Sequence, residues 1–478
     1  MATRLPGIFA DISDKRVSSP ASANRRVLAI GIKLPAGSLA VNTERQIFSE
    51  AEAIEAAGEG SQAVQMVRAI RSQNARVNLT LVVVDAPVGA AATQTLTVSG
   101  TATTAEPAIL RIEGETVVVD LAIGDDANAI AGKINTELGL DDHDGLHQAA
   151  TVVAAQVTLT AKSHGVHGNG ILLAEVLSSP PGVTITPAAG AAGAGAPDLD
   201  AALQALGTTR YDYTILPDLD ATNLADWITY ANGLWEPEQA RDSHAIAFFR
   251  GTVGASATFG LGEDTKHVSA FASPDMPDNP WVIASVIAAA RWTQANPKAS
   301  LYNDDLALSA PIAANRLNPT DRTTLLDAGI GTFHYVQDVP RVERFLTLAK
   351  TNDLAQASEA FLDAETKFTV STIRQEQILR LQPEIGKILV ADRASVQFAV
   401  GVGALTTDVS RIRQLLTTQY SGIALSFEAQ GWVSDPSGFA ADLIVEQLNA
   451  TTIQITTVPR INGILYTALN SIEFILAA

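Results

Sequence analysis

The chain has 478 residues, an apolar share of 47% and a formal net charge of −19, with 32 Lys and Arg against 51 Asp and Glu. This length predicts several domains, and the acidic balance disfavours a nucleic-acid or anionic-membrane partner. There is no cysteine, which excludes disulfides and thiolate metal sites and suits folding in a reducing cytoplasm.

Residues 1–25 are predicted to form an extended N-terminal arm. They lack long apolar runs and contain turn formers such as Ser18-Ser19-Pro20. The first residues also lack the apolar core of a signal peptide. The longest apolar helix candidate, Trp281–Trp292, is too short to span a bilayer, so we expect neither export nor membrane insertion.

A central α/β domain is predicted over residues 26–87 and 196–341. It opens with a strand at Val27–Ile32, a helix at Ser61–Ser72 and a strand at Leu79–Val84, an alternation typical of a parallel sheet. The alternation resumes after an interruption, so both halves are expected to complete one doubly wound sheet. The later candidates are helix Leu199–Leu206, strand Tyr213–Leu216, helix Leu224–Leu234, strand Ala245–Phe249, helix Val282–Trp292 and a last strand at Phe333–Val336.

Residues 88–195 interrupt this pattern and predict an inserted β-rich domain on the outer surface. One helix is expected at Asp126–Leu138, after a cap at Asp125, and the exit at Ala188–Asp200 is predicted to be a flexible Ala/Gly linker. The predicted strands are Thr95–Val98, Ile109–Ile112, Val117–Leu121, Val152–Leu159 and Ile171–Val176.

Residues 342–478 are predicted to form an α+β C-terminal assembly domain. Long helices are expected at Asp363–Leu381 and Asp408–Gln419, and a further helix after Ser434-Asp435-Pro436. Period-two alternation follows Asn449, with Ile453 and Ile455, and the chain finishes on the strand-like run Ile472–Leu476. The apolar face expected for the last helix comprises Phe439, Leu443, Ile444 and Leu448.

Catalysis by a nucleophilic serine is considered because the α/β pattern is shared with hydrolases. Such a serine needs a sharp Gly-flanked turn, a histidine and a carboxylate. The nearest phrase, Gly254-Ala255-Ser256-Ala257-Thr258, lacks the second glycine, although His244 and His267 are possible partners. Because fold alone does not carry function, we expect no catalytic residue.

Two polar segments contain potential metal ligands but are interpreted as loops. His143 and His147 lie near Asp141, Asp142 and Asp144, in a sequence typical of a turn. His164 and His167 lie among glycines, and no closed ligand spacing emerges, so no metal site is expected. The phrases at 329–331 and 401–403 lack the rest of a phosphate loop, so we expect no cofactor.

Several segments together give the chain a resemblance to a known family. The C-terminal part carries a Gly-x-Val turn, a Phe-containing helix, a Val-Glu step and a final apolar strand, at Gly431, Val433, Phe439, Val445, Glu446 and Phe474. The likeness also includes PGIFADIS (6–13), AKSHGVHGN (161–169) and residues 345–352, 361–375 and 388–392. With these features the chain resembles contractile phage tail sheath proteins, most closely the Mu-like branch. Leu346-Thr347-Leu348 and Asp392-Arg393 depart from the usual Thr-Thr-Tyr and Asp-Gly.

The resemblance implies a structural subunit that polymerises around a tail tube and contracts to drive the tube through the host envelope. Its partners would be copies of itself, in six-fold rings stacked helically, together with the tail tube, baseplate and tail terminator proteins. It would be assembled in the host cytoplasm and reside in the virion tail. The alternatives are another structural component of a phage tail or injection machine and an α/β hydrolase.

Both chain ends are predicted to link subunits. An unpaired apolar terminal strand would be a sticky edge, whereas pairing with a neighbour satisfies its backbone. The C-terminal strand could instead pair within its own domain. Candidate linkage residues are Ile8, Phe9 and Ile12 at one end and Ile472, Phe474, Ile475 and Leu476 at the other. By the resemblance, Arg411 and Arg413 would face the tube, unless they lie on a solvated helix face.

Overall fold

The structure is a computed structural model, and it describes residues 25–381 apart from 353. Farther along it describes 388–389, 406–407, 428, 431–435, 438, 441–447, 453–456 and 460–464. The chain divides into two compact units, one of which is Arg25–Ser371, while the other contains the described residues from Thr372 onward. The proposed domain boundaries at 25, 87, 195 and 341 stay predictions.

The first unit is built on a six-stranded sheet whose order is β13-β12-β11-β1-β3-β2. Neighbouring strands from β13 to β3 are parallel, and β2 is antiparallel to β3. The predicted multidomain α/β class and doubly wound sheet are therefore confirmed. The strands are β1 (Val27–Ile32), β2 (Glu44–Ile47), β3 (Leu79–Val84), β11 (Tyr213–Ile215), β12 (His244–Phe248) and β13 (Val268–Phe271).

Helices cover both faces of this sheet, so its central strands are buried on both sides and read as continuous apolar runs. On β1, Val27 and Ala29 pack into one core, and Leu28, Ile30 and Ile32 pack into the other. The first core includes α1 (Glu50–Ala57), α2 (Gln62–Gln73) and α7 (Pro280–Thr293). The second includes α4 (Leu199–Ala205), α5 (Ala221–Trp235), α6 (Val253–Gly262) and α8 (Pro319–Asp327). We call this sheet and these helices the α/β body.

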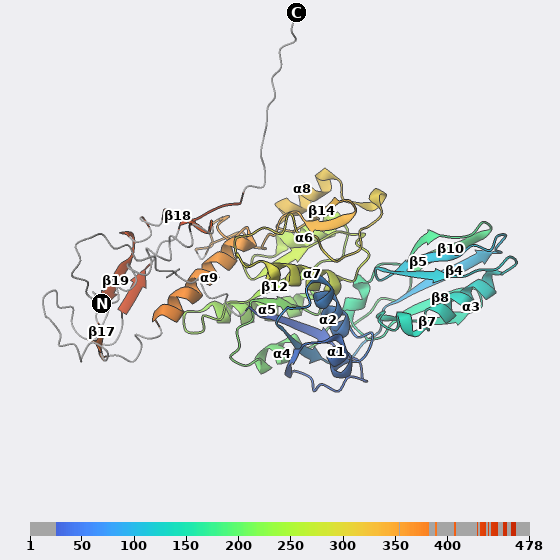
Figure 1. The fold of residues 1–478 in the computed structure, drawn as a ribbon, viewed down its shortest axis with the longest axis horizontal. Helices are drawn as coiled ribbons and strands as arrows, with labels where there is room; N and C mark the ends of the chain where they lie inside the picture. The colour runs from blue at the N-terminus through green and yellow to red at the C-terminus, as the bar shows by residue number, and fades with distance from the viewer. Residues whose placement is uncertain are drawn as a thin grey trace, which may run out of the picture. The chain divides into compact units, whose positions relative to one another are not determined.

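Strands β4 to β10 and helix α3, which together span residues 93–189, form what we call the β-lobe. Figure 1 shows them grouped together in the first unit. One sheet has the order β10-β4-β8-β7 and the other β6-β5-β9, and they share an apolar core with α3. The elements are β4 (Thr93–Gly100), β5 (Ala108–Ile112), β6 (Glu115–Val119), α3 (Ala127–Glu137), β7 (Gln148–Val153), β8 (Gln156–Ala161), β9 (Glu175–Ser178) and β10 (Val183–Ala189), with 3-10 turns η1 (Asp141–His143) and η2 (Val166–Gly170).

Three sequence predictions in this unit need correction. The strand predicted at Val152–Leu159 is a hairpin, because Ala154 adopts a positive φ of 52° and turns the chain between β7 and β8. The cap of α3 is Asp126, which accepts from Ala129 N, whereas Asp125 binds Lys133. Residues Phe333–Val336 (β14) are not the last strand of the large sheet but pair with β15 (Val339–Val342), where positive φ at Gln337 and Asp338 closes a tight turn.

Helix α9 (Ala364–Leu381) confirms the long helix predicted at this position, and it continues beyond Ser371. A 3-10 turn, η3 (Ala313–Asn315), precedes α8. In the second unit the described pairs are β16 (Ile388–Leu389) with β17 (Thr406–Thr407), β18 (Val433–Ser434) with β21 (Arg460–Ile461), and β19 (Ile444–Gln447) with β20 (Ile453–Thr456).

The helix predicted after Ser434 is shorter than expected. Ile444, assigned to its apolar face, lies in β19 and is 51% exposed. The reason is strand pairing, since Val445 is opposite Ile455 in the β19–β20 hairpin. The helix predicted at 408–419 falls outside the described residues. No helix among the described residues is both long and apolar enough to cross a membrane.

Candidate functional site

The crevice where doubly wound folds usually bind ligands lies beyond the carboxyl ends of the strands, at the point where strand order reverses. Here that point falls between β1 and β11. Gln62, which is fully buried at the start of α2, lies there. Its Oε1 accepts from Ile32 N at 2.9 Å and its Nε2 donates to Pro217 O at 2.6 Å. The Gln62 amide thus ties the ends of the two strands together.

The candidate serine does not meet its candidate histidines. Ser256 lies inside α6, is fully buried, and donates to Thr252 O at 3.0 Å. His244 instead lies with Nε2 2.8 Å from Ser269 Oγ, and Lys367 Nζ is 3.2 Å from its Nδ1. Ser269, His244 and Lys367 are hydrogen-bonded in a row, as the groups of a catalytic triad are. Each of the three is at most 1% exposed, so a substrate could not reach them.

Lys367, in the first turn of α9, joins both histidines to the sheet. Its Nζ lies 2.7 Å from Ser243 O, 3.2 Å from His244 Nδ1 and 3.0 Å from His267 Nδ1. Burial lowers the pKa of His244 well below its ordinary value and that of His267 to about 2, so both rings are neutral. Burial also lowers the pKa of Lys367. Its ammonium form would have one acceptor for each of its three protons. The cluster is therefore a buried polar anchor for α9.

Glu365, two residues earlier in α9, should make stability depend on pH. It is fully buried, and burial raises its pKa to about 7, although Arg291 opposes this shift. The folded protein then holds a proton that the unfolded chain releases above its ordinary pKa near 4.5. Stability from this group is complete below pH 4.5 and is lost as pH rises towards 7.

We expect Glu365→Gln to abolish this loss of stability at higher pH. The loss should be on the order of 3 kcal/mol, since each unit of pKa shift corresponds to about 1.4 kcal/mol. The measurement is the difference in thermal unfolding between wild type and variant at several pH values. A difference that is the same at pH 4.5 and pH 7.5 would contradict the assignment.

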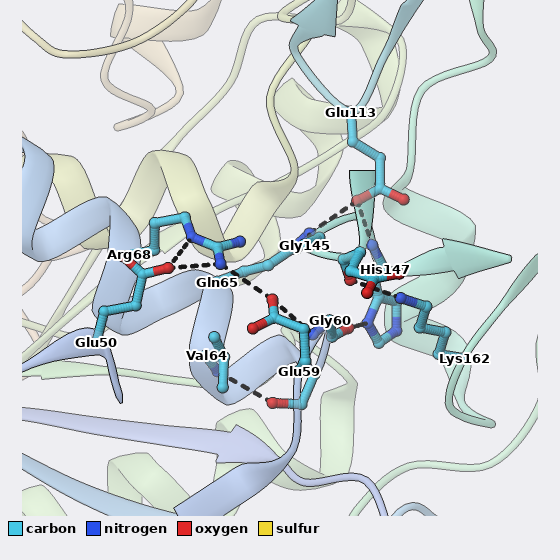
Figure 2. Close-up of polar contacts among 12 residues, drawn as sticks. Glu50, Glu59, Gly60, Val64, Gln65, Arg68, Glu113, Gly145, His147 and Lys162 are labelled. Atoms are coloured by element: carbon cyan, nitrogen blue, oxygen red, sulfur yellow. Dashed lines mark hydrogen bonds and ion pairs between the residues drawn. The ribbon is translucent and has the colours of Figure 1, made fainter. Parts of the chain in front are cut away.

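Glu113 connects the β-lobe to the α/β body (Figure 2). It lies in the tight turn between β5 and β6, with a φ of 52°. From the body its Oε2 accepts from Gln65 Nε2 at 2.9 Å and from Asn279 Nδ2 at 2.8 Å. From the β-lobe Oε2 accepts from His147 N at 2.8 Å and Oε1 from Gln148 N at 2.9 Å. One carboxylate thus satisfies donors on α2, α7 and the start of β7.

Arg68 of α2 lies beside this connection and holds two body carboxylates. Figure 2 shows its guanidinium between Glu50 and Glu59, and its Nε donates to Glu50 Oε1 at 2.7 Å. Its second contact joins Nη2 to Glu59 Oε1 at 3.0 Å. These ion pairs raise the pKa of Arg68 despite the opposing effect of burial. They fix the loop that carries Gly60, the residue whose carbonyl faces His147.

The fold brings together one histidine from each of the two loops with potential metal ligands and leaves the other two apart from that pair. His143 Nδ1 lies 2.6 Å from Glu115 Oε1, and His164 is exposed. His147 and His167 do come together, although sequence spacing did not indicate it. Over the residues that the structure describes, no three His, Cys, Asp or Glu side chains are grouped to hold a metal ion.

The two connections of the β-lobe are in close backbone contact. Ala194 N donates to Ala90 O at 3.0 Å, and a Cβ on Gly89 would lie 1.9 Å from Ala194 O. Asn169 binds both backbone groups of Gly193, with Oδ1 accepting at 2.7 Å and Nδ2 donating at 3.0 Å. The Ala/Gly exit predicted as a flexible linker is therefore hydrogen-bonded to the entry, and its small residues permit the close approach.

The predicted linkage and tube-contact residues lie outside the described residues, and their roles stay predictions. These are Ile8, Phe9, Ile12, Arg411, Arg413, Ile472, Phe474, Ile475 and Leu476. Sequence reasoning missed Glu113, Gln62 and Lys367. Each is an ordinary polar residue whose importance depends on distant partners. Only Lys367 gave a signal in the sequence, because a charged residue within the apolar positions of a predicted helix indicates a buried polar contact.

Residues 192–348 match the family described as the phage tail sheath protein central domain. The Mu-like prophage FluMu tail sheath protein of Haemophilus influenzae is 28% identical over 459 residues, covering 93% of this chain and 92% of that protein.

Two solved structures were also similar. A sheath tail protein from Desulfitobacterium hafniense has a TM-score of 0.49 at 13% identity, covering 95% of this chain and 100% of that one. A sheath tail protein from Listeria innocua has a TM-score of 0.48 at 12% identity, covering 92% and 93%. The family match and the Haemophilus relative bear out the resemblance stated from the sequence: residues 192–348 match a phage tail sheath central domain, and the chain is similar to a Mu-like tail sheath protein over 93% of its length.

Proposed function

We propose that this protein is the polymerising subunit of a contractile tail sheath, which surrounds a tail tube and contracts to drive it through the host envelope. The observation that carries this proposal is the relationship to a Mu-like tail sheath protein, which extends over 93% of the chain and 92% of the relative. The proposed partners are further copies of the chain, in six-fold rings stacked helically, and the tube, baseplate and terminator proteins of a virion tail assembled in the host cytoplasm.

The α/β body suits a subunit that moves as a rigid piece. Gln62 at the strand ends and Lys367 in the first turn of α9 are buried polar groups that hydrogen bonds tie to distant parts of this body. Rigid bodies can rotate against one another while the contacts between copies exchange. Contraction would then draw on the difference in free energy between two sets of interfaces. We propose that no residue is catalytic.

The first experiment is negative-stain electron microscopy of the purified chain. We expect rings or tubules, because sheath interfaces join different patches on successive copies and so allow an open filament. Deletion of residues 1–20, or of those after Asn470, should leave a folded monomer that does not form tubules, since the ends are proposed to add strands to neighbouring sheets. Full-length protein that stays monomeric at every concentration would contradict the sheath assignment. Normal tubules from either truncation would contradict only the proposed role of the ends.

A further inference from the structure

Two histidines of the β-lobe meet in the interior, where the lobe contacts the α/β body. His147 precedes β7 and His167 lies in η2, and their side chains are 0% and 5% exposed. Their Nε2 atoms are 3.2 Å apart, and Ser163 Oγ lies 3.0 Å from the first and 2.9 Å from the second. Trp281 of α7 packs its ring edge-on against both imidazoles, with centroid separations of 5.3 and 5.6 Å.

The surrounding hydrogen bonds determine where the protons lie. His147 Nδ1 is 2.9 Å from Gly60 O, and Figure 2 shows this contact reaching the loop before α2. A carbonyl can only accept, so Nδ1 carries the proton and Nε2 of the neutral ring accepts. The Ser163 hydroxyl can donate to that Nε2 while accepting from Nε2–H of His167. The remaining atom, His167 Nδ1, is buried without a hydrogen-bond partner, as suits a lone pair.

Each of these three hydrogen bonds, from His147 Nδ1 to Gly60 O, from Ser163 Oγ to His147 Nε2 and from His167 Nε2 to Ser163 Oγ, uses one proton. No acceptor is left for a further proton on either ring. A proton added to His147 Nε2 would face the Nε2–H of His167 at 3.2 Å. A proton on His167 Nδ1 would be buried without an acceptor, close against the backbone of Gly165. Burying an ionised group without such a partner is costly. The observed contacts therefore fit the form in which both imidazoles are neutral.

The charged groups nearby do not remove this cost. Glu113, in the β5–β6 turn, favours a charged His147, whereas Lys162, after β8, opposes it. Around Lys162 lie Glu59 and Asp144 as well as Arg68 of α2. Trp281 of α7, which packs against both rings, carries no charge. Burial is the largest effect, and it lowers the pKa of both His147 and His167.

We propose that His147, Ser163 and His167 form an acid-sensitive latch, which holds the β-lobe on Gly60 and Trp281 of the α/β body while both imidazoles are neutral and releases it when either is protonated. Because the closed form binds the proton less well than an opened form, closure is complete above the ordinary histidine pKa near 6.5 and is lost as pH falls below it. The latch does not depend on polymerisation.

The test is hydrogen exchange of the full-length chain at pH 7.5 and pH 5.0, corrected for the intrinsic effect of pH on exchange. We expect at least a tenfold rise in the opening equilibrium at pH 5.0 for peptides spanning 145–170. The double variant His147→Asn with His167→Gln keeps amide donors but cannot be protonated, so its opening should not change with pH. His164→Gln, which replaces an exposed histidine of the same loop, should behave like wild type.

A second measurement guards against a double variant that fails to fold. Release would expose the Trp281 indole to water, so wild-type emission should shift to longer wavelength with a midpoint below pH 6.5, and Trp281→Phe should remove that transition. Equal exchange at both pH values, or a pH response that persists in the double variant, would overturn the latch. The latch would also be overturned if elemental analysis found a stoichiometric metal ion bound at these histidines in the purified protein, because the metal would take the place of the proton on His167 Nε2.

Discussion

Lys367→Ala is expected to destabilise the α/β body by about 3–5 kcal/mol, because a buried group left without its hydrogen-bond partner costs roughly 1–3 kcal/mol and truncation of a buried side chain adds the cost of a cavity. The substitution would leave Ser243 O and Nδ1 of both His244 and His267 without their common donor. It would also leave a cavity under the first turn of α9. Thermal unfolding should show a lowered transition, and hydrogen exchange should rise first at the start of α9.

Two variants separate the lost contacts from lost volume. Lys367→Met keeps most of the apolar stem and should cost less than Lys367→Ala, since only the polar contacts are removed. Lys133→Ala removes a lysine whose side chain is 39% exposed and whose ion pair with Asp125 lies in the β-lobe, so it should cost under about 1 kcal/mol. If Lys367→Ala proved as mild as Lys133→Ala, the cluster would not be an anchor.

Glu113→Ala should weaken the attachment of the β-lobe by about 3 kcal/mol, because hydrogen bonds to a charged acceptor contribute roughly 1.5–3 kcal/mol each and do not add fully. The donors left behind are Gln65 Nε2, Asn279 Nδ2 and the backbone N–H groups of His147 and Gln148. The unfavourable φ of 52° at this position is common to Glu and Ala, so backbone strain should change little.

Limited proteolysis of the lobe's connections and differential scanning calorimetry would measure this effect. We expect faster cleavage near residues 87–92 and a separate, earlier transition for the β-lobe. Glu115→Ala is the matched control, because Glu115 opens β6 directly after the same turn but its carboxylate contacts His143 of the β-lobe. An unchanged cleavage rate in Glu113→Ala, equal to that of the control, would mean that other contacts hold the lobe.

The sheet was predictable because local pattern and long-range packing agree there. Val27–Ile32 and Leu79–Val84 are buried on both faces, so they appear in the sequence as uninterrupted apolar runs. Ser61 marks the start of α2 by accepting from Val64 N at 3.1 Å. In contrast, β2 was missed, since Glu44–Ile47 is a short edge strand with one residue fully buried.

The connections within the interior could not be predicted from the sequence. Glu113 and Asn279 are 166 positions apart, and Lys367 and Ser243 are 124 apart. No repeating pattern in the sequence relates residues so far apart, and each is a polar or charged residue of a type that is common on protein surfaces. His147 and His167 illustrate the same limit: they were noted as ligand types in polar loops, but only the pairing of β7 with β8 brings the segments that carry them together.

The entry and exit of the β-lobe lie side by side, so the lobe could be exchanged without rebuilding the sheet that carries it. Because Ala90 and Ala194 are joined by a backbone hydrogen bond of 3.0 Å, whatever lies between them closes a ring whose ends already touch. A segment of almost any length can be exchanged at such a point without moving the strands on either side, since the cost of closing a longer loop grows slowly. A lobe of different size or surface could therefore be inserted at this point while the strands of the large sheet keep their register.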